Sequence, residues 1–587
     1  MSVDVKAENS PKSSSHVGEN NSQEEDSFHQ SDFYLHGPLQ CLFGFNGAFL
    51  QLPGLPMMFI INDLVEMPLE LLGAYGAISF LPWSFKPLYA IMDCWWSQKS
   101  RRHFLLAIML MICGLITISM TFIPHKGSLG LVMFLSFSQN VSSAFAEFLL
   151  GLTLLDQVEV QISMQSSSVN ELERELLVGS RISAEYKSIE SISGTLQGQA
   201  ATCRNAGSLA SATGLLLILV SRGMSLEMNY QLAALLLLLS GVLALIASLI
   251  ALFYQVGSLP ETVKTSRRTA SANHVDDIVN HSSSVEILHS YGNTARAASL
   301  SRSEIFAVTL FQVLIIWLGL KSIFTNYLVW LGGIVLLCVV GLLGAVFLKV
   351  QTCNLADAVY KSYSAADSSK RTAFFLVLWS AVPSVSYQWY SYSYELFHKE
   401  PLLLQVISWV GTAATMGGSY LFSTQLSPHL SNQRCSISRM LALTTLASSS
   451  VSLLYAIISI INNHSSETGR NLLFINFASA VPIVAISSFV LEIKFLPAVA
   501  LATSSSLSLA KSPQGCSIPE FARGLHYGTL ISCINFGDQL GSWLSVPLVH
   551  ILGIDRGNWS KMTELIVICA ILEATSVIFL PLISTSD

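Results

Sequence analysis

Charged residues are scarce in this chain, and their scarcity excludes most soluble functions. Only 12% of the 587 residues are Asp, Glu, Lys or Arg, whereas 51% are hydrophobic, and the mean hydropathy is +0.54. Soluble domains carry about 25% charged residues. The net charge is only −6, and no basic patch points to nucleic acid as a partner. The composition therefore indicates a polytopic membrane protein whose partners include membrane lipid.

Paired cysteines are lacking as well. The ten cysteines are scattered mostly through apolar segments, with no Cys-x-x-Cys spacing and no paired histidines nearby. Packing as small apolar residues explains them, so we expect no disulfide framework, no metal site and no other cofactor. A His- or Asp-rich catalytic motif is also missing, so we expect that the chain is not an enzyme.

Residues 1–37 lack both arginine and an apolar core. A signal peptide needs the apolar core, and a transit peptide is rich in Arg and poor in acidic residues. The segment is instead rich in Ser, Asn and Glu, which predicts a disordered cytoplasmic tail. The sequence leaves the plasma membrane, an endomembrane and the plastid envelope open as the membrane of residence.

Long apolar runs, in contrast, are abundant. A spanning helix needs about 20 apolar residues. Six runs lie in the first half, at about 39–60, 68–92, 103–124, 128–155, 196–220 and 229–254. Six lie in the second half, at about 372–393, 402–424, 438–461, 471–503, 524–552 and 564–583. Two more, at about 303–320 and 327–348, would form a hairpin, so we predict fourteen spans, with twelve as the alternative.

The runs divide the chain into five parts. These are the tail at 1–37, a six-helix half at 38–254, a central loop at 255–302, the extra hairpin at 303–350 and a second six-helix half at 351–583. Lys and Arg concentrate in loops that are cytoplasmic if the N-terminus is inside, the central loop among them. Six plus six spans is the layout of the major facilitator superfamily. The expected fold class is thus an all-α, major-facilitator-like helix bundle.

Ionisable residues in the second run form the first candidate site. A helix through Lys86 to Asp93 places Lys86, Tyr89 and Asp93 on one stripe, and Pro82 and Pro87 should kink it. A charge at membrane depth costs on the order of 3 kcal/mol and usually faces the bundle interior or an aqueous pathway. The alternative is that Lys86 extends its amino group to the cytoplasmic boundary.

A second polar stripe lies in the seventh run. Gln388, Ser391, Tyr392 and Glu395 are spaced i, i+3, i+4 and i+7, which puts them on one face of a helix. We expect this face to border a cavity. The alternative is that the tyrosines belong to the aromatic belt at the membrane interface.

These stretches resemble the folate-biopterin transporter family, plant type. The run Pro82-Trp83-Ser84-Phe85-Lys86-Pro87-Leu88-Tyr89, followed by Asp93 and Arg101-Arg102, is similar to its signature Pro-Trp-x-x-Lys-Pro-x-Tyr-Gly-x-x-Ser-Asp. Pro383-Ser384-Val385-Ser386 and Tyr390 through Leu396 are similar to its Pro-Ser-x-Ser and Phe-Tyr-x-Tyr-Thr-x-Glu-Leu. The fourth span departs from the family, which has an acid and then Asp four residues later. Here Glu147 keeps the first, position 151 is Gly, and the next acid is Asp156.

The resemblance implies a major-facilitator transporter that moves folates or pterins, with proton symport in some members. It implies substrate-binding roles for Trp83, Lys86, Tyr89, Arg204, Gln388, Tyr390, Tyr392 and Asn535. It implies proton-coupling roles for Glu147, Asp156 and Glu395, and gating roles for Asp93, Arg101 and Arg102. Two alternatives remain, namely a transporter of another small organic anion or amphiphile and, with less support, a polytopic scaffold or enzyme.

Overall fold

The computed structural model is built from helices. The structure describes residue 35 and the ranges 37–67, 69–96, 102–123, 129–168, 178–221, 230–253, 367–397, 399–431, 437–464, 470–508, 520–555 and 558–584. The central loop at 255–302, the hairpin at 303–350, nearly all of the tail and Arg101 lie outside these ranges. The predictions made for them are therefore not addressed below.

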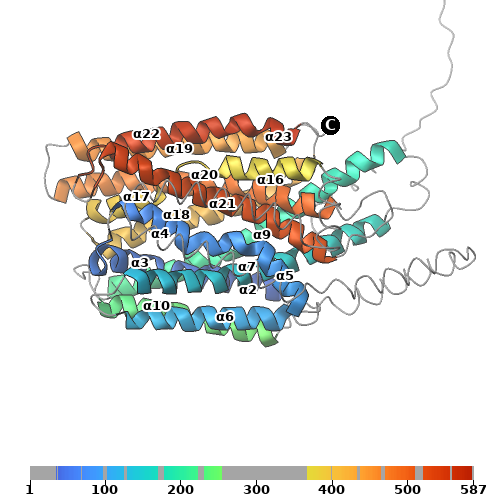
Figure 1. Cartoon of the computed structure of the whole chain (residues 1–587), viewed down its shortest axis with the longest axis horizontal. Helices are drawn as coiled ribbons and strands as arrows, with labels where there is room; N and C mark the ends of the chain where they lie inside the picture. Colours follow the sequence, from blue (N-terminus) through green and yellow to red (C-terminus); the bar gives the residue numbers. More distant parts are fainter. Residues whose placement is uncertain are drawn as a thin grey trace, which may run out of the picture. The chain divides into compact units, whose positions relative to one another are not determined.

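The described residues of the first half form six helical passages, three of them built from several short helices. The first passage is α2 (Gly37–Gln51), α3 (Gly54–Phe59) and the π-helix η1 (Ile60–Leu64). The second is α4 (Leu69–Phe80), the 3-10 helix η2 (Leu81–Phe85) and α5 (Lys86–Trp96). Then follow α6 (Arg102–Ser119) with η4 (Met120–Phe122), α7 (Leu129–Ser168), α9 (Val178–Ser221) and α10 (Tyr230–Phe253) (Figure 1).

The second half repeats this number of passages. The seventh is α16 (Asp367–Ser380) and α17 (Ser386–Leu396), and the eighth is α18 (Pro401–Leu421) with η5 (Phe422–Leu426) and η6 (Pro428–Ser431). The remaining passages are α19 (Ile437–His464), α20 (Arg470–Ser508), α21 (Glu520–Leu552) and finally α22 (Met562–Thr575) with η8 (Ser576–Phe579) and α23 (Pro581–Ser584).

Eight segments among the described residues are long and apolar enough to cross a membrane. They are Gly37–Leu64, Arg102–Phe122, Leu129–Ile162, Ile189–Ser221, Tyr230–Phe253, Ile437–Asn463, Asn471–Leu507 and Met562–Ile583. The number of spans, fourteen or twelve, stays a prediction. Of the other four runs, the second and seventh are each interrupted, while α18 and α21 are long but less apolar. These four passages also make most of the contacts between the two halves.

Proline explains both interruptions. Pro82 lies in the first turn of η2, where the backbone tightens into a 3-10 turn, and Pro87 lies in the first turn of α5. Proline supplies no N–H for the helical ladder, which explains the break. Pro383 lies in the non-helical residues 381–385 between α16 and α17. In a membrane, backbone that leaves the helical ladder is tolerated only where protein or water can satisfy it. Both breaks therefore indicate positions inside the bundle.

The outermost helices have the side-chain arrangement of a lipid-facing surface. On α10 the fully buried positions include the small residues Ala244, Ala247 and Ala251, while Leu249 is 54% and Phe253 77% exposed. Small residues let helices approach closely, and lipid tails accept the large apolar side chains. The helix packs closely against α6. These helices are thus built for a bilayer.

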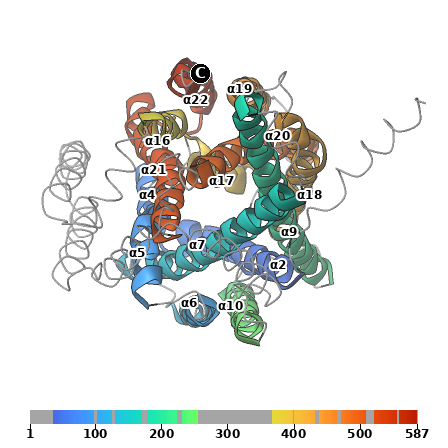
Figure 2. The ribbon, with the colours of Figure 1, turned by 90° about the vertical axis from the view of Figure 1, so that its right-hand side faces the viewer.

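Contacts between the halves run through a few helix pairs. Helix α9 of the first half packs against α18 and α20, and α21 of the second half packs against α4 and α5. Figure 2 shows α9 crossing beside α18 and α2, and α21 beside α4. The candidate site lies along these contacts.

A candidate site between the two halves

Glycines bring α2 and α9 into direct backbone contact, and this crossing positions the first charged residue of the site. A Cβ added to Gly47 would lie 1.9 Å from the carbonyl oxygen of Arg204, and one added to Gly207 would lie 1.8 Å from that of Gly44. Only glycine fits at such a crossing. The crossing fixes the position of Arg204 relative to Asn46, which lies beside Gly47 in the sequence.

Arg204 and Asn46 both reach the carboxylate of Glu147 on α7. Arg204 Nη1 lies 3.7 Å from Glu147 Oε1, and Asn46 Nδ2 donates to Glu147 Oε2 at 3.5 Å. The side chains of Arg204 and Glu147 remain 28% and 20% exposed. Both distances are long for a charge-assisted hydrogen bond, which is usually about 2.7–2.9 Å. The pair is therefore loose and accessible.

Lys86 is buried close to this pair. It begins α5 directly after η2, is 5% exposed, and interacts electrostatically with Glu147 and Arg204. Its Nζ lies 5.4 Å from the ring centroid of Trp83, a cation–π contact. A side chain so little exposed does not reach a lipid headgroup or bulk water. The prediction of an inward-facing Lys86 fits this placement better than the boundary alternative does.

The second half supplies a carboxylate that our sequence interpretation did not include. Glu492 on α20 is 8% exposed and accepts a hydrogen bond from Asn205 Nδ2 at 3.1 Å. Arg204 also acts on it electrostatically. Two cations and two carboxylates, Lys86, Arg204, Glu147 and Glu492, thus come together from both halves, and we refer to them as the central ion network.

The polar stripe of α17 does not border a cavity, which corrects that prediction. Gln388 is fully buried with Nε2 3.3 Å from Ser545 Oγ, and Ser391 is 3% exposed. Tyr392 is 1% exposed, with Trp389 and Trp559 at 5.5 and 5.2 Å between ring centroids. This stripe therefore packs on protein, although Gln388 Oε1 is buried without a hydrogen-bond partner among the described residues.

The opposite face of α17 is the open one. Tyr390 is 51% exposed, and Ser386 on the same face is also exposed. Protein nevertheless surrounds Tyr390 at longer range, and Figure 2 shows α17 inside the ring of helices. Tyr390 therefore borders an accessible space within the bundle.

Three other predicted binding residues serve the packing around η2. Tyr89 is 2% exposed, donates its hydroxyl to the carbonyl of Pro82 at 2.9 Å and stacks on Phe145 at 4.6 Å. Asn535 of α21 donates to the carbonyl of Trp83 at 2.9 Å. Trp83 Nε1 in turn donates to Asn140 Oδ1 at 2.8 Å. The bond from Asn535 occupies the Trp83 carbonyl, for which Pro87 four residues later has no N–H to donate.

Arg102 forms a compact cluster with two acids. It lies 3.1 Å from Asp93 and 2.7 Å from Asp156, with side chains 7%, 9% and 14% exposed. Asp93 and Arg102, which we predicted to be gating residues, are thus paired. Asp156, predicted to carry protons, belongs to this cluster and not to the central ion network. The cluster links the first residue of α6 to α5 and to α7.

The third predicted proton carrier also lies elsewhere. Glu395, near the end of α17, accepts a hydrogen bond from Trp559 Nε1 at 2.6 Å. Next to it, Tyr394 donates to Asp63 of η1. Lys399 lies 2.5 Å from the same aspartate, which joins the first half to the second. Of the three acids, Glu147 alone belongs to the central ion network.

Another ion pair between the halves lies toward the other end of the passages. Arg523 of α21 is 2.6 Å from Glu159 of α7, with side chains 9% and 30% exposed. Successive passages alternate in direction, so the ends of the first and seventh passages share one side of the bundle. The end of the fourth passage and the start of the eleventh share the opposite side. Arg523 and Glu159 therefore pair on the side opposite Asp63 and Lys399.

The residues missed by sequence reasoning carried a usable signal. Glu492, Asp63, Arg523 and Glu159 are ionisable residues inside or next to long apolar runs, the criterion that selected Lys86. What the sequence could not supply is the partner of each, because the partners are more than 300 residues away in three of these four cases. Among the described residues, no group of three His, Cys, Asp or Glu side chains is arranged to hold a metal ion.

Comparisons with known proteins give a family. Solved structures similar to this chain include the nucleoside transporter NupG, at 12% identity and TM-score 0.46, covering 92% of this chain and 96% of that one. The POT family transporter PepTSo is 13% identical with TM-score 0.49, covering 94% and 99%. A POT family transporter in complex with 5-aminolevulinic acid is 12% identical with TM-score 0.45, covering 95% and 99%. No curated protein sequence matches the chain.

The family model matches residues 167–587, well over half of the chain. This range contains Arg204, Glu492, α17 and the whole second half. The chain belongs to the BT1 family and is a membrane transporter.

Proposed function

We propose that the chain is a secondary active transporter that moves folates or pterins across a membrane by alternating access, coupled to protons. The central ion network carries this proposal, since it brings Lys86, Arg204 and Glu147 of the first half and Glu492 of the second half to one place. Binding sites of two-half transporters lie at the interface between the halves. Buried charges at that depth are costly unless they are paired or serve a ligand.

Two cations of the network suit the carboxylates of a folate. Lys86 and Arg204 would meet them, and Trp83 and Tyr390 would offer ring faces for the pterin. Tyr89 and Tyr392 suit this less well, because other aromatic rings already cover their faces. We therefore assign them to positioning, together with Gln388 and Asn535.

Exchange of carboxylates provides a route to coupling. In the structure, Glu147 takes the place beside Arg204 that a substrate carboxylate would need. The long 3.7 Å contact and the partial exposure of both groups allow replacement. A displaced Glu147, left without its cation in a low-dielectric interior, favours its protonated form. Binding of an anion and uptake of a proton are then linked at this one residue.

The ion pairs at the two ends would act as gates. Asp63 with Lys399 and Arg523 with Glu159 join the halves on opposite sides. Rocking of one half against the other must break each pair in turn, because opening one side separates the residues there. The cluster of Asp93, Arg102 and Asp156 lies within the first half and would keep its helices together during this motion.

A transporter of another organic anion is the second candidate, and a specific contact favours it. The family's second acid is replaced by Gly151, and a Cβ at this position would lie 2.9 Å from the hydroxyl of Tyr527. The tyrosine thus fills the space that an aspartate would need. A site with one carboxylate fewer on α7 would suit a substrate with different polar groups.

Uptake measurements separate the two candidates. The chain is expressed in cells that lack folate transport, and uptake of labelled folate is measured at external pH 5.5 and 7.5 with unlabelled pterins, nucleosides and dicarboxylates as competitors. Saturable folate uptake that rises at acid pH and is blocked by pterins supports the proposal. Absence of folate uptake by protein that reaches the membrane contradicts it and favours the second candidate.

A further inference from the structure

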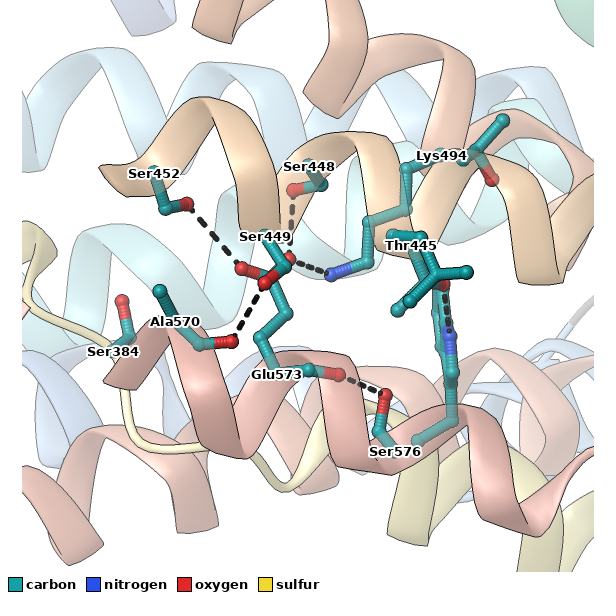
Figure 3. Close-up of polar contacts among 12 residues, drawn as sticks. Ser384, Thr445, Ser448, Ser449, Ser452, Lys494, Ala570, Glu573 and Ser576 are labelled. Atoms are coloured by element: carbon teal, nitrogen blue, oxygen red, sulfur yellow. Dashed lines mark hydrogen bonds and ion pairs between the residues drawn. The ribbon is translucent and has the colours of Figure 1, made fainter. Parts of the chain in front are cut away.

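A second group of ionisable side chains lies inside the second half. Lys494 of α20 and Glu573 of α22 form an ion pair of 2.6 Å, and their side chains are only 13% and 14% exposed. Lys494 lies on a different face of α20 from Glu492, which belongs to the central ion network. Figure 3 shows the amino group of Lys494 beside the Glu573 carboxylate, with serines of α19 on its other side.

The carboxylate of Glu573 is held in a fixed position. Ser448 donates to Oε1 at 2.7 Å and Ser452 to Oε2 at 3.3 Å. Between them, Ser449 donates to the carbonyl of Ala570 at 2.7 Å, which ties α19 to α22 (Figure 3). Lys494, Ser448 and Ser452 together hold the Glu573 carboxylate in one position.

The ammonium group of Lys494 also contacts an aromatic ring. It lies 5.2 Å from the ring centroid of Trp379 on α16, and this indole is oriented by a hydrogen bond from Nε1 to Thr445 Oγ1 at 2.9 Å. The lysine thus has a cation–π contact in addition to Glu573. It also acts electrostatically on a third acid, Asp538 of α21.

Asp538 connects this group to the contact between the halves. Its side chain is exposed, although protein surrounds it at longer range, so the carboxylate borders an accessible space inside the bundle. The next residue, Gln539, donates to the carbonyl of Phe80 at 2.6 Å and accepts from Ser84 Oγ at 3.1 Å, both in the first half. A change at Asp538 therefore occurs next to a contact that must rearrange when the halves move.

We propose that Asp538, Lys494 and Glu573 form a second proton-binding site, separate from Glu147, in the transport cycle. The inference rests on the proposed function, since it supposes a proton-coupled transporter. An ionised Asp538 competes with Glu573 for Lys494. A proton that arrives from the accessible space binds the Asp538 carboxylate and leaves Lys494 to Glu573, and its release on the other side restores the competition.

The other described side chains next to Lys494 and Glu573 are poor proton acceptors. Cys569 of α22 acts electrostatically with Glu573. The described side chains that α16 and α19 contribute to the cluster are Trp379, Thr445, Ser448, Ser449 and Ser452, all uncharged. The proton is therefore assigned to Asp538, with Lys494 as the group that responds to it.

A first test needs no substrate. Dicyclohexylcarbodiimide modifies protonated carboxyl groups in apolar surroundings, and mass spectrometry of the purified full-length protein locates the adduct. We expect labelling of Asp538 that falls as pH rises. Glu573 should be protected in the wild type and labelled in Lys494→Gln. Failure to label Asp538 at any pH, or labelling that does not change with pH, overturns the proposal.

A second test measures coupling in proteoliposomes with the membrane potential clamped at zero. Each coupled proton allows one pH unit to raise accumulation by a factor of about ten. We expect Asp538→Asn to lower steady-state accumulation of labelled folate about tenfold at a gradient of one unit, while folate counterflow continues. Glu564→Gln, an exposed acid paired with Lys561 in the same half, is the matched control and should accumulate folate like the wild type.

The outcomes separate the two proposals. Unchanged accumulation by Asp538→Asn overturns the second proton site and leaves the proposed function standing. Absence of folate counterflow in the wild type contradicts the proposed function instead. In that case the carbodiimide labelling still decides whether Asp538 exchanges protons.

Discussion

At the scale of single residues, three of the four charges of the central ion network are positioned by an uncharged neighbour. Asn46 donates to Glu147, and Asn205 donates to Glu492. Trp83 lies under the ammonium group of Lys86. Pre-positioned polar groups lower the cost of binding an ion, because little reorganisation remains when the ligand arrives. In the proposed function, this positioning would let the charges accept a substrate carboxylate in place of one of their own.

Lys86 is the residue whose replacement should affect anion binding most. We expect Lys86→Ala to abolish saturable uptake of an anionic substrate, because the one remaining cation of the network, Arg204, would stay paired with Glu147. Lys86→Arg should retain part of the uptake, because the charge remains although the shape differs. Uptake by cells with equal surface expression measures both. Lys561→Ala, at a side chain that is 55% exposed, is the control, and full uptake by Lys86→Ala would rule out this role.

Asp93 should matter for turnover more than for affinity. It is paired with the buried Arg102, and removal of one partner of a buried pair costs about 3–5 kcal/mol. We expect Asp93→Asn to lower the maximal rate of uptake at least tenfold and to change KM less than threefold. Initial rates over a range of substrate concentrations give both constants. An unchanged maximal rate in a well-expressed variant would show that the cluster has no part in the conformational change.

At this scale the sequence selects residues by the cost of placing a charge in lipid. A lysine in an apolar run must avoid lipid, which was enough to select Lys86, whereas Arg204 and Glu147 were named from the family resemblance. This cost could not decide between protein and an accessible space as the surroundings of a polar stripe, since both avoid lipid. The stripe of Gln388 and Tyr392 was assigned to the wrong surroundings for this reason.

At the scale of elements, close crossings and broken helices decide where the functional groups lie. The α2–α9 crossing places Arg204, and the η2 break places Lys86 at the first turn of α5. Pro82 and Pro87 predicted the first interruption in the sequence, whereas the interruption at Pro383 was not predicted. The crossing was harder to predict, because glycines are common in apolar helices and only their partner shows which of them are in contact.

The α2–α9 crossing gives a prediction with an internal control. Gly47→Ala on α2 would put a methyl group 1.9 Å from the carbonyl oxygen of Arg204 on α9. A Cβ on Gly214, which also lies on α9, meets nothing within 4 Å. Overpacking typically costs about 1–3 kcal/mol. We expect Gly47→Ala to lower the thermal unfolding midpoint and to reduce uptake, and Gly214→Ala to do neither. Equal midpoints for the two variants would mean that the crossing adapts without cost.

At the scale of the whole molecule, ion pairs join the two halves on both sides of the bundle. Residues of the first and seventh passages pair on one side, and residues of the fourth and eleventh on the other. The twelve passages that the described residues form were foreseeable from hydropathy as apolar runs. The long-range pairs were not, since a charge near the end of a run has many partners of opposite sign to choose from.

Reversal of a charge pair tests the gating role. Glu159→Gln leaves the mostly buried Arg523 without its carboxylate, which we expect to cost that closed side about 2 kcal/mol and shift the population roughly 30-fold toward opening there. Asp63→Asn should shift it in the opposite direction. Modification rates of single cysteines placed on either side report the shifts. The double exchange Glu159→Arg with Arg523→Glu should restore the original rates, and shifts in the same direction for both single variants would contradict opposed gates.

The four passages that are interrupted or less apolar than the rest have a consequence for biosynthesis. A helix enters the bilayer from the translocon according to its own apolarity. The apolar stretch of α16 is short, and α21 is more polar than the candidate spans. Each must remain near the translocon until the helices that shield its polar groups have been made. For α4 and α5 the shielding helix is α21, which is synthesised more than 400 residues later. Nascent chains that end before α21 should therefore be recognised by quality control as incompletely inserted and degraded.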